Sequence, residues 1–335
     1  DLVDFPFVDE ASRAVALSAL ITPVVRGALL VAPLHAARAP TPGSGKSFLV
    51  DIVSAIATGQ RCPVIAASQS DEENEKRLGS ALLAGQPLVS IDNINGELKG
   101  DTLSQLIERP IVQVRILGRS ETKSIESRST VFATGNNLVV AADIVRRVVL
   151  CSLDPEVERP ELRQFGGDPF KKVLSDRGAY VAAALTVVRA YITAGCPAQR
   201  PALASFEDWS RLVRSALVWL GCADPVDTMD TARAEDPETA GMREVFASWR
   251  DAIGFERSLV AGEIVTASDE KQPANDAPKR LRDSLARVAG DGHAVSPVRL
   301  GLWLRRHKDR IAGGMKISGT IDAHSKTTRW RLVEC

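Results

Sequence analysis

Residues 39–50 read Ala-Pro-Thr-Pro-Gly-Ser-Gly-Lys-Ser-Phe-Leu-Val, and this stretch decides which fold we expect. A loop of small residues enters Gly45-Lys46-Ser47, and an apolar helical pattern follows it. Glycines let backbone N–H groups turn inward around a phosphate, and the positive end of the following helix adds to the attraction. This order is typical of the P-loop, a turn that binds nucleotide phosphates.

The loop predicts a nucleotide site with specific ligands. Lys46 is expected to reach the β- and γ-phosphates, and the Ser47 hydroxyl is expected to bind Mg²⁺. One position departs from the G-x-x-x-x-G-K-[ST] pattern, because Pro40 stands where glycine is usual. The alternative is a flexible Gly/Ser loop that precedes a lysine by chance. The candidate ligands are Pro42, Gly43, Ser44, Gly45, Lys46, Ser47 and Phe48.

A second apolar run, residues 88–91, ends in Asp92 and Asn93, about 45 residues after the loop. P-loop ATPases place the second Mg²⁺ contact on an acidic residue at the end of such a strand, so Asp92 is predicted to bind the metal with Ser47. The alternative is an aspartate that caps the next turn. Asn93 replaces the usual glutamate that polarises the attacking water. Either Asn93 orients this water, or nearby Glu97 does, or hydrolysis is slow.

Residues 130–137 read as a further buried strand that ends in two asparagines, Asn136 and Asn137. An amide there is suited to hydrogen-bond a γ-phosphate or the attacking water, unless both asparagines only form the turn. Arg146 and Arg147 follow, directly ahead of another apolar strand. These arginines are either surface charge or a means of reaching the phosphate of a neighbouring molecule.

Two stretches carry the positive charge that DNA would need. Residues 111–128 alternate as a hairpin does, with Arg115, Arg119 and Lys123 near the tip; the alternative is an edge hairpin that the charges keep from pairing. The last stretch, residues 279–335, reads as two helices and a strand–turn–strand, the outline of a winged helix. Winged helices bind DNA or dock proteins. The tail's candidate DNA contacts are Arg305, Arg306 and Lys326.

The strands alternate with helices up to about residue 153, which predicts an α/β fold with a parallel sheet and helices on both faces. The polar strand ends then meet at the carboxyl edge, where open α/β sheets bind ligands. Residues 179–192 are apolar around most of their circumference and predict a core helix. Residues 205–220 predict another helix, with Ser205 as its N-cap. The expected domains are a nucleotide-binding core (1–165), a helical lid (166–260), a linker (261–278) and a winged helix (279–335).

Composition sets wide limits. The chain has 335 residues, enough for one large or two to three smaller domains. Lys+Arg and Asp+Glu number 42 each, so a surface that binds nucleic acid must be local. The five cysteines include no C-x-x-C pair, and we expect reduced thiols in a cytoplasmic protein. No apolar run is long enough to cross a bilayer, and the start at Asp1 suggests a fragment of a longer protein.

Together these motifs resemble the AAA+ P-loop ATPases, and within them the hexameric replicative helicases (superfamily III or MCM-like) of phages, plasmids and integrated mobile elements. In this resemblance residues 132–137 match the sensor-1 strand, residues 143–147 match the segment with the arginine finger, and the hairpin at 111–128 matches the one that lines the central pore. Four motifs occur in the family's order. The tail matches through its outline alone.

The resemblance implies an ATP-dependent DNA helicase that replicates a mobile element or prophage. ATP and Mg²⁺ would lie between subunits of a homo-hexamer, with one asparagine at the γ-phosphate and one arginine supplied by the neighbour. Single-stranded DNA would pass the hairpins, and duplex DNA would meet the winged helix. The alternative is an ATP-switched replication initiator or helicase loader that binds origin DNA through the winged helix. A protein-remodelling motor is disfavoured, because residues 94–104 contain no aromatic residue.

Overall fold

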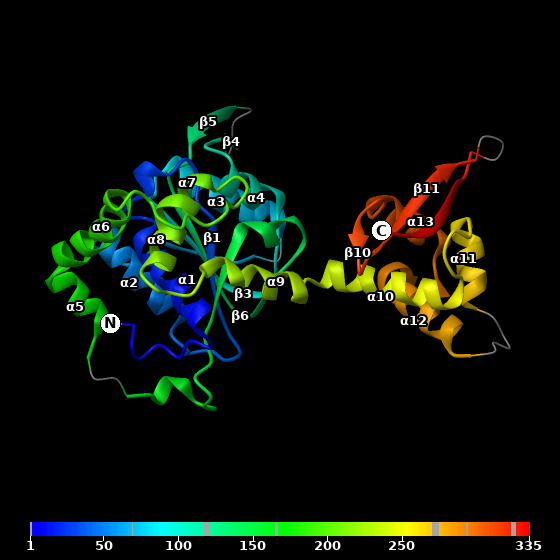
Figure 1. Ribbon diagram of the computed structural model, residues 1–335, viewed down its shortest axis with the longest axis horizontal. Helices are drawn as coiled ribbons and strands as arrows, with labels where there is room; N and C mark the ends of the chain where they lie inside the picture. The colour runs from blue at the N-terminus through cyan, green and yellow to red at the C-terminus, as the bar shows by residue number, and fades with distance from the viewer. Residues whose placement is uncertain are drawn as a thin grey trace. The chain divides into compact units, whose positions relative to one another are not determined.

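The computed structural model describes residues 2–68, 70–116, 121–164, 167–269, 275–292, 294–322 and 326–335. The chain forms two compact units, with the boundary between Glu235 and Asp236. Each unit has its own hydrophobic core. Figure 1 shows the helices and strands of both units, coloured in chain order. Within the described ranges, no helix is both long and apolar enough for a bilayer crossing.

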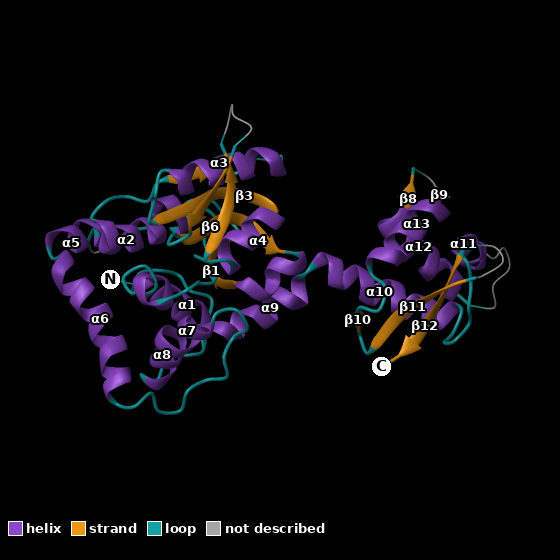
Figure 2. Ribbon diagram, turned by 90° about the horizontal axis from the view of Figure 1, so that it is seen from above, coloured by secondary structure: helices purple, strands orange, loops and turns teal. Residues whose placement is uncertain are grey.

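The first unit is built on a five-stranded parallel sheet with the order β2-β3-β6-β1-β7, and helices flank it (Figure 2). Strands β1 and β7 are buried almost continuously, as expected where both faces of a sheet are covered. The predicted α/β class with a parallel sheet is confirmed at this level. The strands are β1 (Leu34–Ala39), β2 (Val64–Ala66), β3 (Leu88–Leu98), β6 (Thr130–Val140) and β7 (Val148–Ser152).

The helices of this unit begin with α1, which precedes the sheet, and α2, which follows the loop at residues 40–45. They are α1 (Glu10–Ile21), α2 (Lys46–Thr58), α3 (Asp71–Leu83), α4 (Asp101–Glu108), α5 (Pro169–Ser175), α6 (Arg177–Thr193), α7 (Glu207–Trp209), α8 (Ser215–Trp219) and α9 (Thr228–Glu235). Shorter helical turns are η1 (Arg26–Ala28), η2 (Ala142–Arg147), η3 (Pro160–Leu162), the π-helical η4 (Ser210–Arg214) and η5 (Pro225–Asp227).

Helix α6 differs from the predicted core helix. It buries Ala184, Val188 and Tyr191, while Leu185 and Ile192 are about half exposed. The three buried residues lie on one stripe at helical spacing. The sequence does not show which stripe is buried, because most positions of this segment are apolar. Alanines on an exposed face cannot be told from alanines in a core. The core-helix prediction is therefore wrong.

The predicted hairpin is present as β4 (Ile111–Arg115) and β5 (Thr122–Glu126), an antiparallel pair outside the main sheet. It stands out at the top of the first unit in Figure 1. Its exit is tied down by buried Arg26, whose guanidinium donates to the carbonyls of Ser127 at 3.0 Å and Ser129 at 3.3 Å. Burial lowers the pKa of Arg26 to about 10, with Arg128 contributing in the same direction. The candidate residue Arg119 lies outside the described residues.

In the second unit, the described residues form a three-stranded antiparallel sheet, β10-β11-β12, and four helices that pack with it. Trp249, Leu281 and Trp330 are buried at its centre. The pairing of β11 with β12 matches the predicted strand–turn–strand. The elements are α10 (Pro237–Ala252), α11 (Ala261–Ser268), α12 (Ala277–Ala289), β8 (Gly290–Asp291), β9 (Ala294–Val295), α13 (Pro297–Arg306), β10 (Ile311–Ala312), β11 (Met315–Ile321) and β12 (Thr328–Glu334).

The unit boundary differs from the expected division into a lid ending at 260 and a linker over 261–278. Helix α10, expected in the lid, puts Met242, Phe246 and Trp249 into the second core. Residues 261–268, expected in the linker, form α11 with Ile264 fully buried. The apolar stripe of α10 shows that one face is buried but not which core buries it.

Candidate functional site

The loop between β1 and α2 is shaped by two glycines. Gly43 and Gly45 have φ of +74° and +96°, the left-handed region that glycine alone enters without strain. A Cβ at Gly43 would lie 3.3 Å from the Glu161 backbone nitrogen, and one at Gly45 would lie 3.3 Å from the Phe5 ring. Among the described residues, no side chain caps the N-terminus of α2. Its first N–H groups therefore remain available to an anion.

Lys46, the first residue of α2, folds back across this loop. Its Nζ donates to Asn136 Oδ1 at 2.8 Å and to the Thr41 carbonyl at 3.1 Å. Burial lowers the pKa of Lys46, and the negative charge of Asp92 partly offsets this effect. The ammonium thus lies between the loop and Asn136 of β6, where added negative charge would favour its protonated form.

Ser47 and Asp92, predicted to share a metal ion, lie together although 45 residues separate them. The Ser47 hydroxyl donates to Asp92 Oδ1 at 2.9 Å. The Thr134 hydroxyl donates to the same oxygen. Strand β3 carries Asp92 and its parallel neighbour β6 carries Thr134. Hydroxyl and carboxylate oxygens at this spacing are the hard ligands that Mg²⁺ prefers.

Thr134 is a site residue that the sequence analysis did not single out. It is only 1% exposed, and besides Asp92 it contacts the backbone nitrogen of Asn93, which donates to its hydroxyl at 3.4 Å. The available signal was a hydroxyl directly after the apolar residues 131–133, two positions before the first asparagine. A threonine is so common in buried strands that this signal is weak.

The two asparagines that end the predicted strand are separated by the structure. Asn136 accepts the Lys46 hydrogen bond and is half-buried, whereas Asn137 is exposed with φ of +49°. Consecutive residues of a strand point to opposite faces, so only one of them can face the loop. Asn136 is the one that does.

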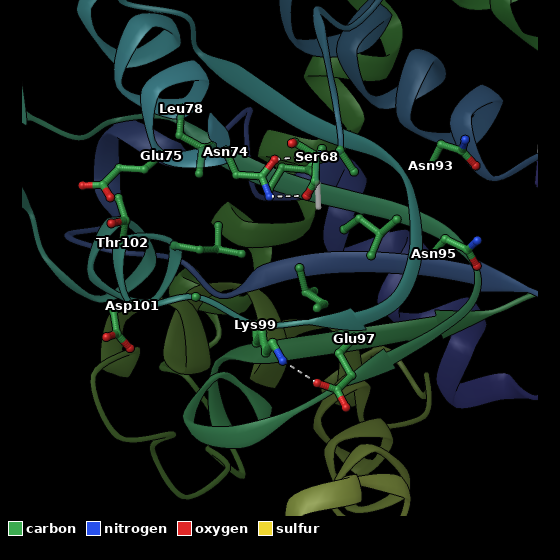
Figure 3. Close-up of a pocket in the computed structure, with 16 residues that line it drawn as sticks. Ser68, Asn74, Glu75, Leu78, Asn93, Asn95, Glu97, Lys99, Asp101 and Thr102 are labelled. Atoms are coloured by element: carbon green, nitrogen blue, oxygen red, sulfur yellow. Dashed lines mark hydrogen bonds and ion pairs between the residues drawn. The ribbon is translucent and has the colours of Figure 1, made fainter. Parts of the chain in front are cut away.

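Of the two candidates for orienting water, Asn93 lies next to Asp92, and Glu97 lies farther along the strand. Strand β3 does not stop at Asn93 but continues, with two bulges, to Leu98. Five residues of extended chain span about 15 Å, and the Glu97 carboxylate accepts a hydrogen bond from Lys99 Nζ at 2.7 Å. Figure 3 shows Asn93 and Glu97 at separate places around a cavity of about 680 Å³ between α3, β3 and the start of α4. Of the two candidates, Asn93 is the one adjacent to Asp92.

Arg146 and Arg147 differ sharply in exposure. The Arg147 side chain is 4% exposed and pairs with Glu108 at 2.6 Å and Asp143 at 2.5 Å. The Arg146 side chain is 47% exposed, with Nε on Asp143 at 3.0 Å. Arg147 is therefore committed within its own chain, and Arg146 is the arginine that another molecule can reach.

A cavity of about 420 Å³ lies beside the loop, on the side of Gly43 and Gly45. Its walls are largely apolar and include the rings of Phe5 and Phe48, whose centroids are 6.4 Å apart. Phe48 was predicted from its place after the loop. The remaining walls come from chain segments distant in sequence, which no local pattern could reveal: residues 4–6, the three residues Pro160, Glu161 and Arg163, and residues 167–169.

The predicted DNA contacts are dispersed. Arg115 and Lys123 are exposed on the hairpin. Arg115 faces the acidic start of α3, since it adds to Lys76 in lowering the pKa of Glu72. Lys326 precedes β12 with φ of +53°.

In the second unit most of the basic residues are paired. Arg306 lies 3.7 Å from Glu238, and Arg305 donates to the Gly301 carbonyl at 3.3 Å. Burial raises the pKa of Glu238, but hydrogen bonds from His307 and Arg310 outweigh this and lower it overall. Further pairs join Arg299 to Asp291, Arg310 to Glu238, Arg329 to Glu263 and Arg331 to Glu256.

Comparison with known proteins assigns no family. No protein-family model matches the chain, and no curated protein matches it. Backbones similar to this one include the apo A form of the NrS-1 C-terminal region, at 12% identity and a TM-score of 0.42, covering 97% of this chain and 76% of that one. A structure of residues 305–718 of that region gives 12% and 0.44, covering 99% and 73%.

JCV helicase bound to a thiazolopyridine-phenoxyphenyl acetamide gives 13% identity and a TM-score of 0.31, covering 68% of this chain and 66% of that one. Likenesses at this level carry no weight for function. The interpretation of the site therefore rests on its own geometry: a glycine loop at a helix N-terminus, with a lysine, a serine and an aspartate brought together at the carboxyl edge of a parallel sheet.

Proposed function

We propose that this chain is an ATPase of the AAA+ type that works as a DNA helicase in the replication of a mobile element or prophage. The observation that carries the proposal is the convergence of Lys46, Ser47 and Asp92 on one point of the sheet edge. A chance Gly/Ser loop would not bring an aspartate of a strand 45 residues away within hydrogen-bonding distance of the serine after its lysine.

ATP would lie across the loop from the apolar cavity to Asp92. The base would enter the cavity beside Phe5 and Phe48, and the phosphates would meet the N–H groups of α2 and the ammonium of Lys46. Ser47 and Asp92 would hold Mg²⁺, which neutralises charge on the β- and γ-phosphates. Thr134 fixes the carboxylate rotamer, and Asn136 holds Lys46 in the site.

Hydrolysis would need two subunits of a hexameric ring. We assign the cation supplied by the neighbour to Arg146, because Arg147 is enclosed by Glu108 and Asp143. A cation of this kind accounts for about a thousandfold or more of the rate in related arrangements. Dilution to monomers should therefore reduce turnover while nucleotide binding persists.

DNA would be gripped by the hairpin at 111–128, with its cations on the phosphates of a single strand. A double variant, Arg119→Ala with Lys123→Ala, should abolish unwinding and leave nucleotide binding intact. Unwinding that survives this change would rule out the hairpin as the gripping element. The second unit, as a winged helix, would contact duplex DNA through residues such as Arg305 and Lys326.

The test is ATPase activity of the whole chain with and without single-stranded DNA, together with its size in ATP. We expect stimulation by DNA and a ring in ATP, and subunits of Lys46→Ala should have no DNA-stimulated turnover of their own. ATP binding by Lys46→Ala as tight as that of the parent would overturn the proposal. Binding to one duplex sequence with no DNA-stimulated turnover would favour the initiator or loader, a function that the compact second unit would suit.

A further inference from the structure

One carboxylate joins three separate elements of the first unit. Glu108 is the last residue of α4, and its Oε2 accepts hydrogen bonds from Arg147 in η2, at 2.6 Å from Nη2 and 3.1 Å from Nε. Its Oε1 accepts from the Ser205 hydroxyl at 2.6 Å. Ser205 precedes α7, so Glu108 links α4, η2 and the helical segment 207–219.

Ser205 differs here from the predicted helix cap. Its backbone has φ of +71°, the residue after it is the N-cap of α7, and its hydroxyl is donated to Glu108. The hydrogen bond from Ser205 is the largest influence that lowers the pKa of Glu108, and Arg147 adds to it against the effect of burial. Glu108 is therefore ionised at neutral pH, and it accepts from both η2 and the segment before α7.

The two arginines of η2 use this carboxylate in different ways. Arg147 is held on two sides: besides Glu108 it donates to the Asp143 carboxylate at 2.5 Å and to the Asp143 carbonyl at 2.8 Å. Arg146 lies at the outer edge, where its Nη1 is 3.5 Å from Glu108 Oε1. Glu108 and Asp143 thus hold the Arg146 guanidinium from one side, and its other side is open to solvent.

We propose that Glu108 is the positioning residue for Arg146, and that Ser205 links this position to the helical segment 207–219 of the same subunit. The inference rests on the proposed function of Arg146 as the cation that acts on a neighbour's nucleotide. Arg147 fixes η2 to Glu108, and Glu108 sets the position and direction of the Arg146 guanidinium. A shift of the segment at Ser205 changes that position and direction. Nucleotide binding within the subunit does not involve Glu108.

The experiment compares Glu108→Gln and Arg146→Ala, alone and mixed with an excess of Lys46→Ala subunits. Misplacement of about 1 Å costs up to a hundredfold in rate, so Glu108→Gln should lower kcat roughly tenfold or more with KM within about twofold. Lys46→Ala subunits are inactive but carry a native Glu108 and Arg146. In the mixture, each Glu108→Gln subunit should therefore regain the activity of wild-type subunits mixed with the same excess.

Each result decides the inference. Wild-type kcat for Glu108→Gln overturns it, and so does a deficit that the Lys46→Ala subunits fail to relieve, since Glu108 would then act within its own subunit. If the Lys46→Ala subunits restore the lost activity of Arg146→Ala but not that of Glu108→Gln, the role of Glu108 is rejected and that of Arg146 stands. Full activity of Arg146→Ala instead rejects the proposed function of Arg146. Glu10→Gln, which removes an exposed carboxylate 3.6 Å from Arg13, is the matched control.

Discussion

The two units differ in how their charged residues are arranged. One group lies at the carboxyl edge of the first unit's sheet, and the other consists of the basic residues of the second unit. At the sheet edge, Lys46, Ser47 and Asp92 come from two elements and meet at one point. In the second unit, the arginines are spread over helix and strand surfaces. Several of them are paired with carboxylates of the same unit.

The contrast shows that the residue spacing of a motif predicts which side chains lie close together. A count of charged residues predicts the electrostatic potential of a surface less well. The loop at residues 40–45 brings its residues together through backbone geometry that glycine allows. A basic composition does not tell where the acidic partner of each basic residue lies. Glu238 alone pairs with His307, Arg306 and Arg310. The exposed pairs of this unit, such as Arg331 with Glu256, contribute about 0–1 kcal/mol each and largely cancel the positive field.

The most severe test removes the centre of the first site. Lys46→Ala should weaken nucleotide binding by roughly a hundredfold, because a desolvated charge-assisted contact accounts for about 2–5 kcal/mol. It should also abolish hydrolysis. Titration of a fluorescent ATP analogue measures the affinity, and Arg305→Ala, in the second unit, should leave it unchanged. Equal losses in both variants would contradict the contrast.

A second variant separates metal chemistry from binding. Asp92→Asn keeps the shape of the side chain but removes its charge, so hydrolysis should fall by about a hundredfold while nucleotide affinity changes by less than about tenfold. Turnover measured against Mg²⁺ concentration provides the check. Thr134→Val should give a smaller loss of the same kind, since it only frees the Asp92 carboxylate to rotate. An unchanged Mg²⁺ dependence would separate Asp92 from the metal.

The basic surfaces are compared through salt dependence. Removing Arg115 and Lys123 together should reduce the slope of log affinity for single-stranded DNA against log salt by about 1.4, if each contacts one phosphate. Removing Arg306 and Arg310, which share Glu238, should change the slope by less than about half of that. The reverse order would move the DNA site to the second unit.

The smallest effect concerns the junction at Glu108. Its pKa is below the ordinary 4.5, so its ionised form stabilises the fold above that pH, and the stabilisation is lost as the pH falls below it. At pH 7, Glu108→Gln should lower the free energy of unfolding by about 1 kcal/mol. Urea denaturation at pH 7 and pH 3.5 should show the difference between parent and variant shrinking at the lower pH. A difference that grows would contradict the sign.

Much of the first unit and the hairpin of the second unit could be predicted from the sequence, because these elements obey local rules. The loop, the strand of Asp92, the strand of Asn136, the hairpin and the pair β11–β12 follow from glycine chemistry and from alternation of apolar residues. The strand beyond Asn93 was missed, because bulges interrupt the alternation. Register decides that Thr134 lies beside Asp92 and that Asn136 faces Lys46, and register is set between strands rather than along one.

Other features depend on distant partners. Ser205 looks like a helix cap until Glu108, 97 residues away, takes its hydroxyl. The walls of the cavity beside the loop, the exposure of α6 and the unit boundary after Glu235 are decided by which segments pack together. The choice between Arg146 and Arg147 also required knowledge of which arginine Glu108 and Asp143 enclose.

The fold-back of Lys46 onto Asn136 and Thr41 has a consequence for turnover. The loop and strand β6 each supply an acceptor for the ammonium, so departure of a phosphate would be an exchange of partners rather than exposure of a bare cation to an apolar wall. Such an exchange keeps the loop in one shape through successive cycles. Product would then leave without local unfolding, and the pace of release would depend on how well Asn136 competes for the lysine.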